Sequence, residues 1–375
     1  MKTTEIRQII KNLPRKPDTA YLSEAPVIHS GFPSCFNLSF GEYELLREFH
    51  GQYLVYDHDC IYSKIQPCIR HQDWETIVKD EKNRWRYLSL FNMADVSGLI
   101  IKQNNKEQEE LGKHAILSFV HFIVSLGLKK ENLRISYFAG GKVKDVTKGK
   151  YELETYIPSD PLKDYWKSLG INENQFIPDA TRDTFLALQV FGLPTPWGYR
   201  NEINYLHDGK LLDIGTVEYM KFEPLFVEKK IIALKPFRHS LGISAVGVER
   251  LLMIINNHAN VYDIDIIEPL IHEVLEKCEK KDKTQAMIIV QAIRALHQII
   301  SDGGIYSSLN TRRKEYVRMF CRDMVAAAKK INYNLSPIHI KKILQLNAKL
   351  QLFYPQLLNN IEITGQEIQA RVNQL

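Results

Sequence analysis

The 375-residue sequence has no long apolar run. Its longest uncharged apolar stretch, residues 114–128, is shorter than the roughly 18 residues that a membrane-spanning helix needs. No apolar segment follows the charged residues at the start, so we expect neither a secretion signal nor membrane insertion. The five cysteines are odd in number and form no C-x-x-C pair, which argues against a disulfide framework and a zinc site. These absences favour the reducing cytoplasm.

The common motifs of nucleotide binding and hydrolysis are also missing. The sequence contains no G-x-x-x-x-G-K-[ST], no G-x-G-x-x-G after a strand, no H-E-x-x-H and no G-x-S-x-G. P-loop enzymes, dinucleotide-binding folds and the usual serine and zinc hydrolases are therefore disfavoured.

The composition is that of a globular protein with an uneven distribution of charge. Hydrophobic residues make up 45% of the chain and charged residues 25%, and the length suggests two or three domains. From Lys277 onward there are 16 lysines and arginines against 7 aspartates and glutamates, whereas the preceding residues hold 33 against 37. Such a basic region indicates either a polyanionic partner such as nucleic acid or a solvated surface with no partner.

The hydrophobic pattern predicts an α+β fold. Residues 52–56, 134–138, 202–205 and 211–220 are rich in β-branched and aromatic residues and are expected to be strands, while 108–128 and 161–169 favour helices. Because strands and helices do not alternate regularly, we expect a largely antiparallel sheet flanked by helices. After residue 245 helices dominate, at 247–257, 264–279, 284–301, 312–331 and 337–353. We predict a sheet domain over 1–270 and an all-helical, basic domain over 271–375, with the boundary near the charged segment 276–283.

Three segments place an arginine among apolar residues. Arg70 ends a strand-like run, Arg86 precedes what could be the returning strand of a hairpin, and Arg250 follows a glycine-bearing strand or turn that enters a helix. Arginine suits polyphosphate because its planar guanidinium donates in pairs and stays charged. Taken singly, Arg70 and Arg86 could equally lie on a solvent face or pair with a carboxylate, and the third segment could be a plain helix start.

Taken in order, these segments resemble one known family. The residues are Gln66-x-Cys68-Ile69-Arg70 with Asp73-x-Glu75, then Arg86-x-x-x-x-Phe91-x-Met93, then Gly247-x-Glu249-Arg250-Leu251. They resemble motifs 2 and 3 of the class II aminoacyl-tRNA synthetases, and specifically the catalytic core of alanyl-tRNA synthetases. The later helices resemble the domain of that family that grips the tRNA acceptor stem.

The resemblance implies an antiparallel class II sheet that holds ATP and Mg²⁺, and the cysteine spacing already argues against zinc. Arg70 would contact the α-phosphate and the amino-acid carboxylate, Arg250 the γ-phosphate, and Phe91 the adenine, while Arg86 would support the phosphates and Asp213 would help hold Mg²⁺. The other implied ATP-binding residues are Asp73, Glu75, Gly247 and Glu249. The implied reaction converts an amino acid and ATP into an aminoacyl adenylate and pyrophosphate.

The amino-acid pocket departs from the family pattern. Ile243 stands where the family has an aspartate for the substrate amine, and Glu218 stands at an apolar pocket position. A buried glutamate needs a positive partner, so Glu218 is expected to meet an amino group; alternatively it points out of the sheet or pairs with Lys221 or Arg86. The other residues assigned to the pocket are Met93, Gln189, Trp197 and Thr216.

The basic region leaves the acceptor open. The resemblance implies nucleic-acid contacts from a polar segment and the helix after it, at Asn310, Arg312, Arg313, Arg318 and Arg322. The length leaves no room for an editing domain, so the activated amino acid, alanine or another small or amine-bearing one, could pass to tRNA or to a small-molecule or carrier acceptor. A non-catalytic RNA-binding or regulatory relative is the alternative. Pairing of two copies through residues 40–57 is possible.

Overall fold

The computed structural model describes residues 1–13, 19–28, 36, 60–101, 108–187, 196–228 and 230–375. The predicted strand at 52–56 and the predicted dimerisation segment at 40–57 lie outside these residues. In the described part of the chain, no helix is long and apolar enough to cross a membrane.

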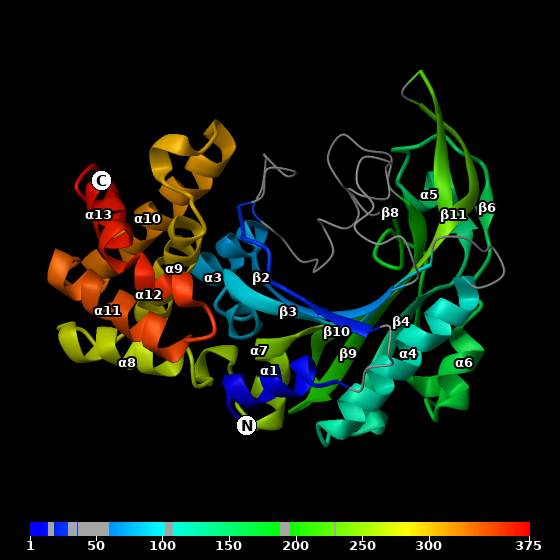
Figure 1. Cartoon of the computed structure of the whole chain (residues 1–375), viewed down its shortest axis with the longest axis horizontal. Coiled ribbons are helices and arrows are strands. Elements are labelled where there is room, and N and C mark those ends of the chain that lie inside the picture. The colour runs from blue at the N-terminus through cyan, green and yellow to red at the C-terminus, as the bar shows by residue number, and fades with distance from the viewer. Residues whose placement is uncertain (14–18, 29–35, 37–59, 102–107, 188–195, 229) are drawn as a thin grey trace.

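A curved sheet forms the centre of the molecule (Figure 1). Within the described residues its strands follow the order β1-β2-β3-β11-β10-β9-β4-β7, with β8 paired to β9. Their bounds are β1 Thr19–Leu22, β2 Cys60–Ile69, β3 Leu90–Ile101, β4 Leu133–Phe138, β7 Phe176–Asp179, β8 Phe185–Ala187, β9 Trp197–His207, β10 Lys210–Val227 and β11 Lys230–Gly247. The predicted strand at 202–205 lies in the second half of β9, and the one at 211–220 forms the first part of β10.

The sheet is mixed, which corrects the antiparallel prediction. The central strands, in the spatial order β2-β3-β11-β10-β9-β4, pair antiparallel. At the edges, β1 runs parallel to β2 and β7 runs parallel to β4. Parallel neighbours require a crossover, and the helical segments between β4 and β7 provide one. A small second sheet of β5 (Gly141–Lys142) and β6 (Tyr156–Ile157) lies within this crossover.

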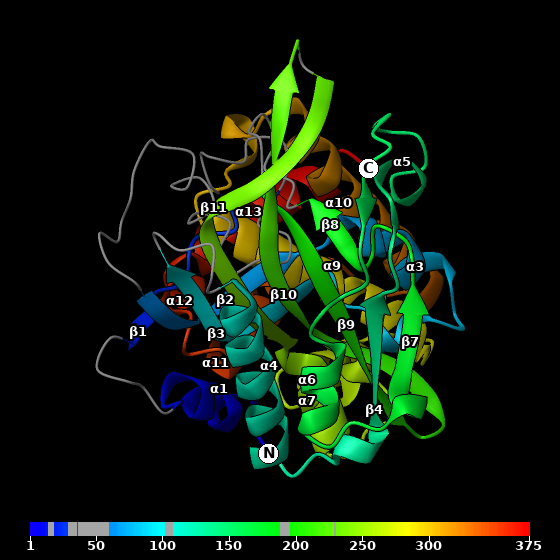
Figure 2. The same ribbon diagram turned by 90° about the vertical axis from the view of Figure 1, so that its right-hand side faces the viewer.

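One face of the central strands is covered by helix α4 (Gln108–Ser125), as Figure 2 shows. A Cβ atom on Gly112 of α4 would lie 3.0 Å from the Tyr219 ring of β10, so glycine permits this close contact. Beside α4, helix α6 (Lys163–Ser168) buries Trp166, whose indole donates to Asn201 of β9 at 2.9 Å. The shorter helices in this half are α1 (Thr3–Lys11), α3 (Trp74–Lys79), α5 (Val143–Val146) and α7 (Val248–Ile255).

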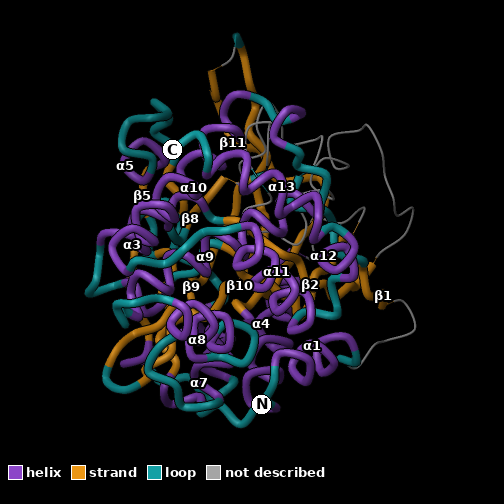
Figure 3. The backbone as a smooth tube through the Cα atoms, turned by 90° about the vertical axis from the view of Figure 1, so that its left-hand side faces the viewer, coloured by secondary structure: helices purple, strands orange, loops and turns teal. Residues whose placement is uncertain are grey.

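From Glu268 onward every regular element is a helix, and the described chain is continuous there from residue 230 (Figure 3). The helices are α8 Glu268–Lys277, α9 Lys283–Ser301, α10 Thr311–Ile331, α11 Pro337–Leu350, α12 Pro355–Asn359 and α13 Ile361–Val372. Helix α9 lies at their centre and is buried on all sides, including its polar residues Gln291, Arg294 and His297. The five helices predicted after residue 245 are confirmed, with ends shifted by a few residues. The proposed division at residue 270 stays a prediction.

Candidate active site

The sheet face opposite α4 carries a cavity of about 160 Å³. Side chains alternate along β10: Val217 and Tyr219 are buried on the α4 side, whereas Thr216 and Glu218 line the cavity. The register places Glu202 of β9 opposite Thr216, and it places Ile243 of β11 opposite Glu218. Alternate residues of four neighbouring strands, β3, β11, β10 and β9, therefore line one cavity.

Most of the residues predicted for ATP and the amino acid meet in this cavity. Those that line it are Arg70, Asp73, Arg86, Phe91, Met93, Asp213, Thr216, Glu218, Ile243, Gly247, Glu249 and Arg250. The first five come from the β2–β3 hairpin and its connection, the next three from β10, and the last four from β11 and the start of α7. The hairpin and the strand-to-helix turn predicted around the three arginines are both present.

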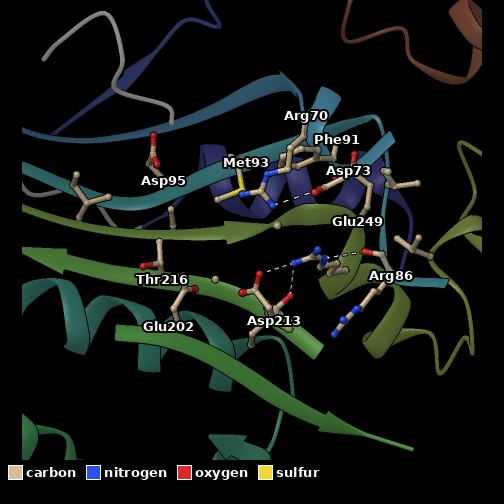
Figure 4. Close-up of a pocket in the computed structure, with 18 of the residues that line it drawn as sticks. Arg70, Asp73, Arg86, Phe91, Met93, Asp95, Glu202, Asp213, Thr216 and Glu249 are labelled. Carbon is tan, nitrogen blue, oxygen red and sulfur yellow. Dashed lines mark hydrogen bonds and ion pairs between the residues drawn. The ribbon is translucent and has the colours of Figure 1, made fainter. Parts of the chain in front are cut away.

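Arg250 joins three parts of the cavity wall, and its partners Asp213 and Arg86 are labelled in Figure 4. Its Nη1 donates to the backbone oxygen of Asp213 at 2.8 Å and to Oδ2 of the same residue at 2.7 Å, and its Nε donates to the backbone oxygen of Arg86 at 3.1 Å. Asp213 lies at a bulge where β9 and β10 shift register, so its carboxylate and the following residues both reach the cavity. Helix α7 is thereby tied to β10 and to the turn before β3.

Arg70 and Asp73 lie at the end of β2 and in the turn that follows it. Arg70 Nη1 is 3.7 Å from Asp73 Oδ2, and its guanidinium carbon is 5.7 Å from the centre of the Phe91 ring. Burial raises the pKa of Asp73, and the nearby Arg70 opposes that rise. Arg70, Arg86 and Arg250 thus place three guanidinium groups around one end of the cavity.

Glu249 is buried beneath the same end. Its carboxylate accepts from the Asn92 backbone nitrogen at 2.9 Å and from Asn92 Nδ2 at 2.6 Å. Burial raises the pKa of Glu249, and the charge of Arg294 on α9 acts in the opposite direction. Burial also lowers the pKa of Arg294 to about 10. Glu249 therefore connects the start of α7 to β3.

The other end of the cavity is acidic. Arg200 of β9 lies between two carboxylates, with its Nε 3.2 Å from Glu218 Oε1 and its Nη2 2.6 Å from Glu202 Oε1. Burial raises the pKa of Glu218 and raises that of Glu202 to about 7, while Arg200 opposes both shifts. The partner of Glu218 is therefore Arg200. The alternative pairing with Lys221 or Arg86 is wrong, since Lys221 binds Glu109 at 2.8 Å and Arg86 Nη2 donates to Asn83 Oδ1 at 3.4 Å.

Two predicted residues, Glu75 and Trp197, do not line the cavity. Glu75 lies on the outer side of α3, 75% exposed and paired with Lys79, because the inner side of that helix buries Trp74. Trp197 has the opposite parity on β9 from the cavity-lining Arg200, and it packs against Phe185 on the other face. Gln189 lies outside the described residues.

Sequence reasoning missed Arg200, Glu202 and Asp95, all of which line the cavity. The sequence pattern assigns Glu202 only to the predicted strand at 202–205. The available signal was the alternation of residues along the strands. Arg200 and Glu202 share one face of β9, and Glu218 lies on the neighbouring buried strand β10. Charged residues that face one another on two buried strands indicate a site.

The predicted nucleic-acid residues lie at the start and along one side of α10. Asn310 caps the helix by accepting from the Arg313 backbone nitrogen at 3.0 Å, so Arg312 and Arg313 belong to its first turn rather than to a loop. Arg313 is buried, 5.9 Å from the Phe36 ring, and is unsuited to contact a phosphate. Arg322 is exposed beside Asp323, and Arg318 lies over the Tyr306 ring.

Comparisons with known proteins identify the family of the chain. A family model described as tRNA synthetases class II (A) matches residues 63–374, so the chain belongs to the class II tRNA synthetases. Within that class its relatives are alanine–tRNA ligases, and the chain is similar to their catalytic core. The ligase of Schizosaccharomyces pombe is 24% identical over 330 residues, covering 79% of this chain and 31% of the relative. The mitochondrial ligase of Saccharomyces cerevisiae is 22% identical over 324 residues, covering 78% and 30%.

The chain thus matches about three tenths of the length of these curated relatives. Among solved structures, the pyrrolysyl-tRNA synthetase of Desulfitobacterium hafniense is 12% identical with a TM-score of 0.35, covering 70% of this chain and 72% of that one.

Proposed function

We propose that the protein activates an amino acid with ATP, forming an aminoacyl adenylate and pyrophosphate. The observation that carries this proposal is the distribution of charge in the cavity. Arg70, Arg86 and Arg250 lie at one end, and Glu202 and Glu218, which share Arg200, lie at the other. The first end suits a triphosphate and the second suits an amine. Family membership supports the same reaction.

The reaction needs positioning and charge neutralisation more than covalent help. A carboxylate oxygen of the amino acid attacks the α-phosphorus, the bond from that phosphorus to the bridging oxygen breaks, and pyrophosphate leaves. Arg70 would hold the attacking carboxylate and the α-phosphate, Arg250 the γ-phosphate, and Phe91 the adenine. Charge that develops on the phosphate oxygens is stabilised by fixed guanidinium groups, so no general base is required.

The cavity also fits Mg²⁺ that is carried in part by the nucleotide. No cluster of three or more metal-ligating side chains occurs in the described part of the chain. Mg²⁺ in nucleotide sites needs only one or two protein carboxylates besides the phosphates, and Asp213, whose side chain is 45% exposed at the arginine end, is one. Bound there, the ion would neutralise phosphate charge, and Asp213 would orient it.

The substrate we propose is alanine or another small or amine-bearing amino acid, because Ile243, Ala245 and Met93 leave a small apolar wall. The acceptor would be tRNA or a small-molecule or carrier acceptor. Exposed basic residues of α10, including Arg322, support tRNA.

The test is ATP–pyrophosphate exchange over a panel of amino acids. We expect exchange with at least one amino acid and its loss in Arg250→Ala. The matched control is Arg134→Ala, because among the described residues the Arg134 guanidinium donates to the backbone oxygens of Glu131 and Leu133, outside the cavity. No exchange with any amino acid would refute the proposal. Tight RNA binding without ATP binding would instead support a non-catalytic relative.

A further inference from the structure

Only one of the two carboxylate oxygens of Glu218 has a polar partner in the described structure. Its side chain is 2% exposed and lines the cavity, and Oε1 lies 3.2 Å from Arg200 Nε. Oε2 is buried and has no hydrogen-bond partner among the described residues. A buried acceptor left unpaired costs free energy, and the cost is larger for a charged group.

The surrounding charges do not balance. Arg200 serves both carboxylates, since its Nη2 is 2.6 Å from Glu202 Oε1 while its Nε lies near Glu218, and Nε also donates to Thr216 Oγ1 at 3.2 Å. When both glutamates are ionised, which for Glu202, with its pKa raised to about 7, requires a pH above that value, this cluster of Arg200, Glu202 and Glu218 carries one excess negative charge. The cluster is therefore complementary to one cation.

The neighbouring strand supplies no such cation. Ile243 lies opposite Glu218 and Ala245 lies opposite Thr216 in the β10–β11 register, and both line the cavity. The arginines of the other end are placed on Asp213 and beside Asp73. Glu218 thus lines a small space with an apolar wall, where a ligand of limited size could bring its own charge.

We propose that Glu218 Oε2 accepts a hydrogen bond from the protonated amine of the substrate, and that this contact selects carboxylic acids that carry an ammonium group. The inference rests on the proposed function, because the substrate carboxylate is taken to lie toward Arg70. A single ammonium neutralises the cluster and satisfies the buried oxygen. A neutral hydroxyl at the same place could donate one hydrogen bond but would leave the excess charge.

A purely structural role for Glu218 makes a different prediction. If the carboxylate only held Arg200, Glu218→Gln would keep an oxygen for Arg200 and would alter the amino acid and its hydroxy-acid analogue alike. An ammonium-binding role affects the amino acid alone. The ratio of the two KM values therefore separates the roles.

The experiment is ATP–pyrophosphate exchange with amino acids, each paired with its hydroxy-acid analogue. We expect the wild type to favour the amino acid, and Glu218→Gln to raise its KM by about 10-fold to 100-fold while the KM for ATP stays unchanged. Glu218→Asp should restore part of the affinity. The control is Glu154→Gln, which changes an exposed carboxylate paired with Lys142, 2.9 Å away. Comparing alanine with 2,3-diaminopropionate and 3-aminopropionate shows whether the bound amine is on the α-carbon or the side chain.

Equal KM values in wild type and Glu218→Gln, or a wild type that accepts hydroxy acids as readily, would overturn the inference and leave the proposed function standing. If no acid supports exchange, the proposed function fails, and saturation-transfer NMR with alanine and 2,3-diaminopropionate decides the inference. Binding that Glu218→Gln abolishes supports it, and no binding to the wild type refutes it.

Discussion

The carboxyl group of Glu202 should make the stability of the protein depend on pH near neutrality. Its side chain is 24% exposed, and burial raises its pKa from the ordinary 4.5 to about 7, with Asp213 and Glu218 adding to the rise and Arg200 and Arg70 opposing it. The folded chain therefore holds this proton at a pH where the unfolded chain has released it. The associated stability is complete below pH 4.5 and is lost as the pH rises through 7.

The size of the effect follows from the two pKa values. A pKa of about 7 against 4.5 corresponds to about 3 kcal/mol, and partial exposure of Glu202 reduces this to about 2–3 kcal/mol. Glu202→Gln mimics the protonated carboxyl and keeps an oxygen for Arg200. Urea unfolding of both proteins from pH 4.5 to 8 measures the difference. We expect similar stabilities at pH 4.5, and a variant more stable than the wild type by about 2–3 kcal/mol at pH 8.

In the difference between the two stabilities, the contributions of the other titrating groups cancel to first order, because both proteins share these groups. A difference that stays constant across this range would show that Glu202 does not carry a raised pKa. A wild type that gains stability relative to Glu202→Gln with rising pH would show the wrong sign. Either result would refute the electrostatic account of the acidic end.

Three further experiments test other parts of the molecule. Arg250→Ala breaks the ion pair with Asp213 and should lower the free energy of unfolding in urea by about 2–4 kcal/mol. It should also lower the ATP affinity measured by calorimetry at least about 10-fold, with Arg250→Lys intermediate. Unchanged ATP affinity would refute the role of Arg250 in ATP binding. If tRNA is bound, Arg318→Ala and Arg322→Ala should each lower the slope of log affinity against log salt by about 1, and an unaltered slope would exclude phosphate contact. Gly215→Ala would place a Cβ 2.3 Å from a backbone oxygen of the next strand and should destabilise the fold by about 1–3 kcal/mol in urea unfolding; a stable variant would mean that the strands can separate there.

The parts of the site predicted from the sequence are those built from local segments. Arg70, Phe91 and Arg250 each lie in a short segment whose neighbouring residues determine its strand, turn or helix. Their motifs therefore indicate both the local structure and the place of each side chain. The mixed sheet could not be predicted, because β1 and β7 pair with strands distant in sequence. Pairing between strands is a property of the whole fold.

The acidic end shows where local reasoning fails. The partner of Glu218 depends on the register between β9 and β10, and a shift of one residue would have turned Arg200 to the opposite face. The same parity places Trp197 outside the cavity although it is near in sequence. Glu75 was misplaced because the orientation of α3 is set by Trp74, which donates to Asp323 on the distant helix α10 at 2.8 Å.

The buried link between Glu249 and the helical region has a consequence for how this chain can evolve. Arg294 of α9 contributes charge next to Glu249, and Tyr354, in the turn before α12, contacts both Asn92 and Arg7 of α1. Removal of the helices after residue 270 would leave these polar groups buried without their partners or open to water beneath the arginine end of the cavity. Selection on folding alone is therefore enough to retain the helical region, whether or not an RNA is ever bound by it.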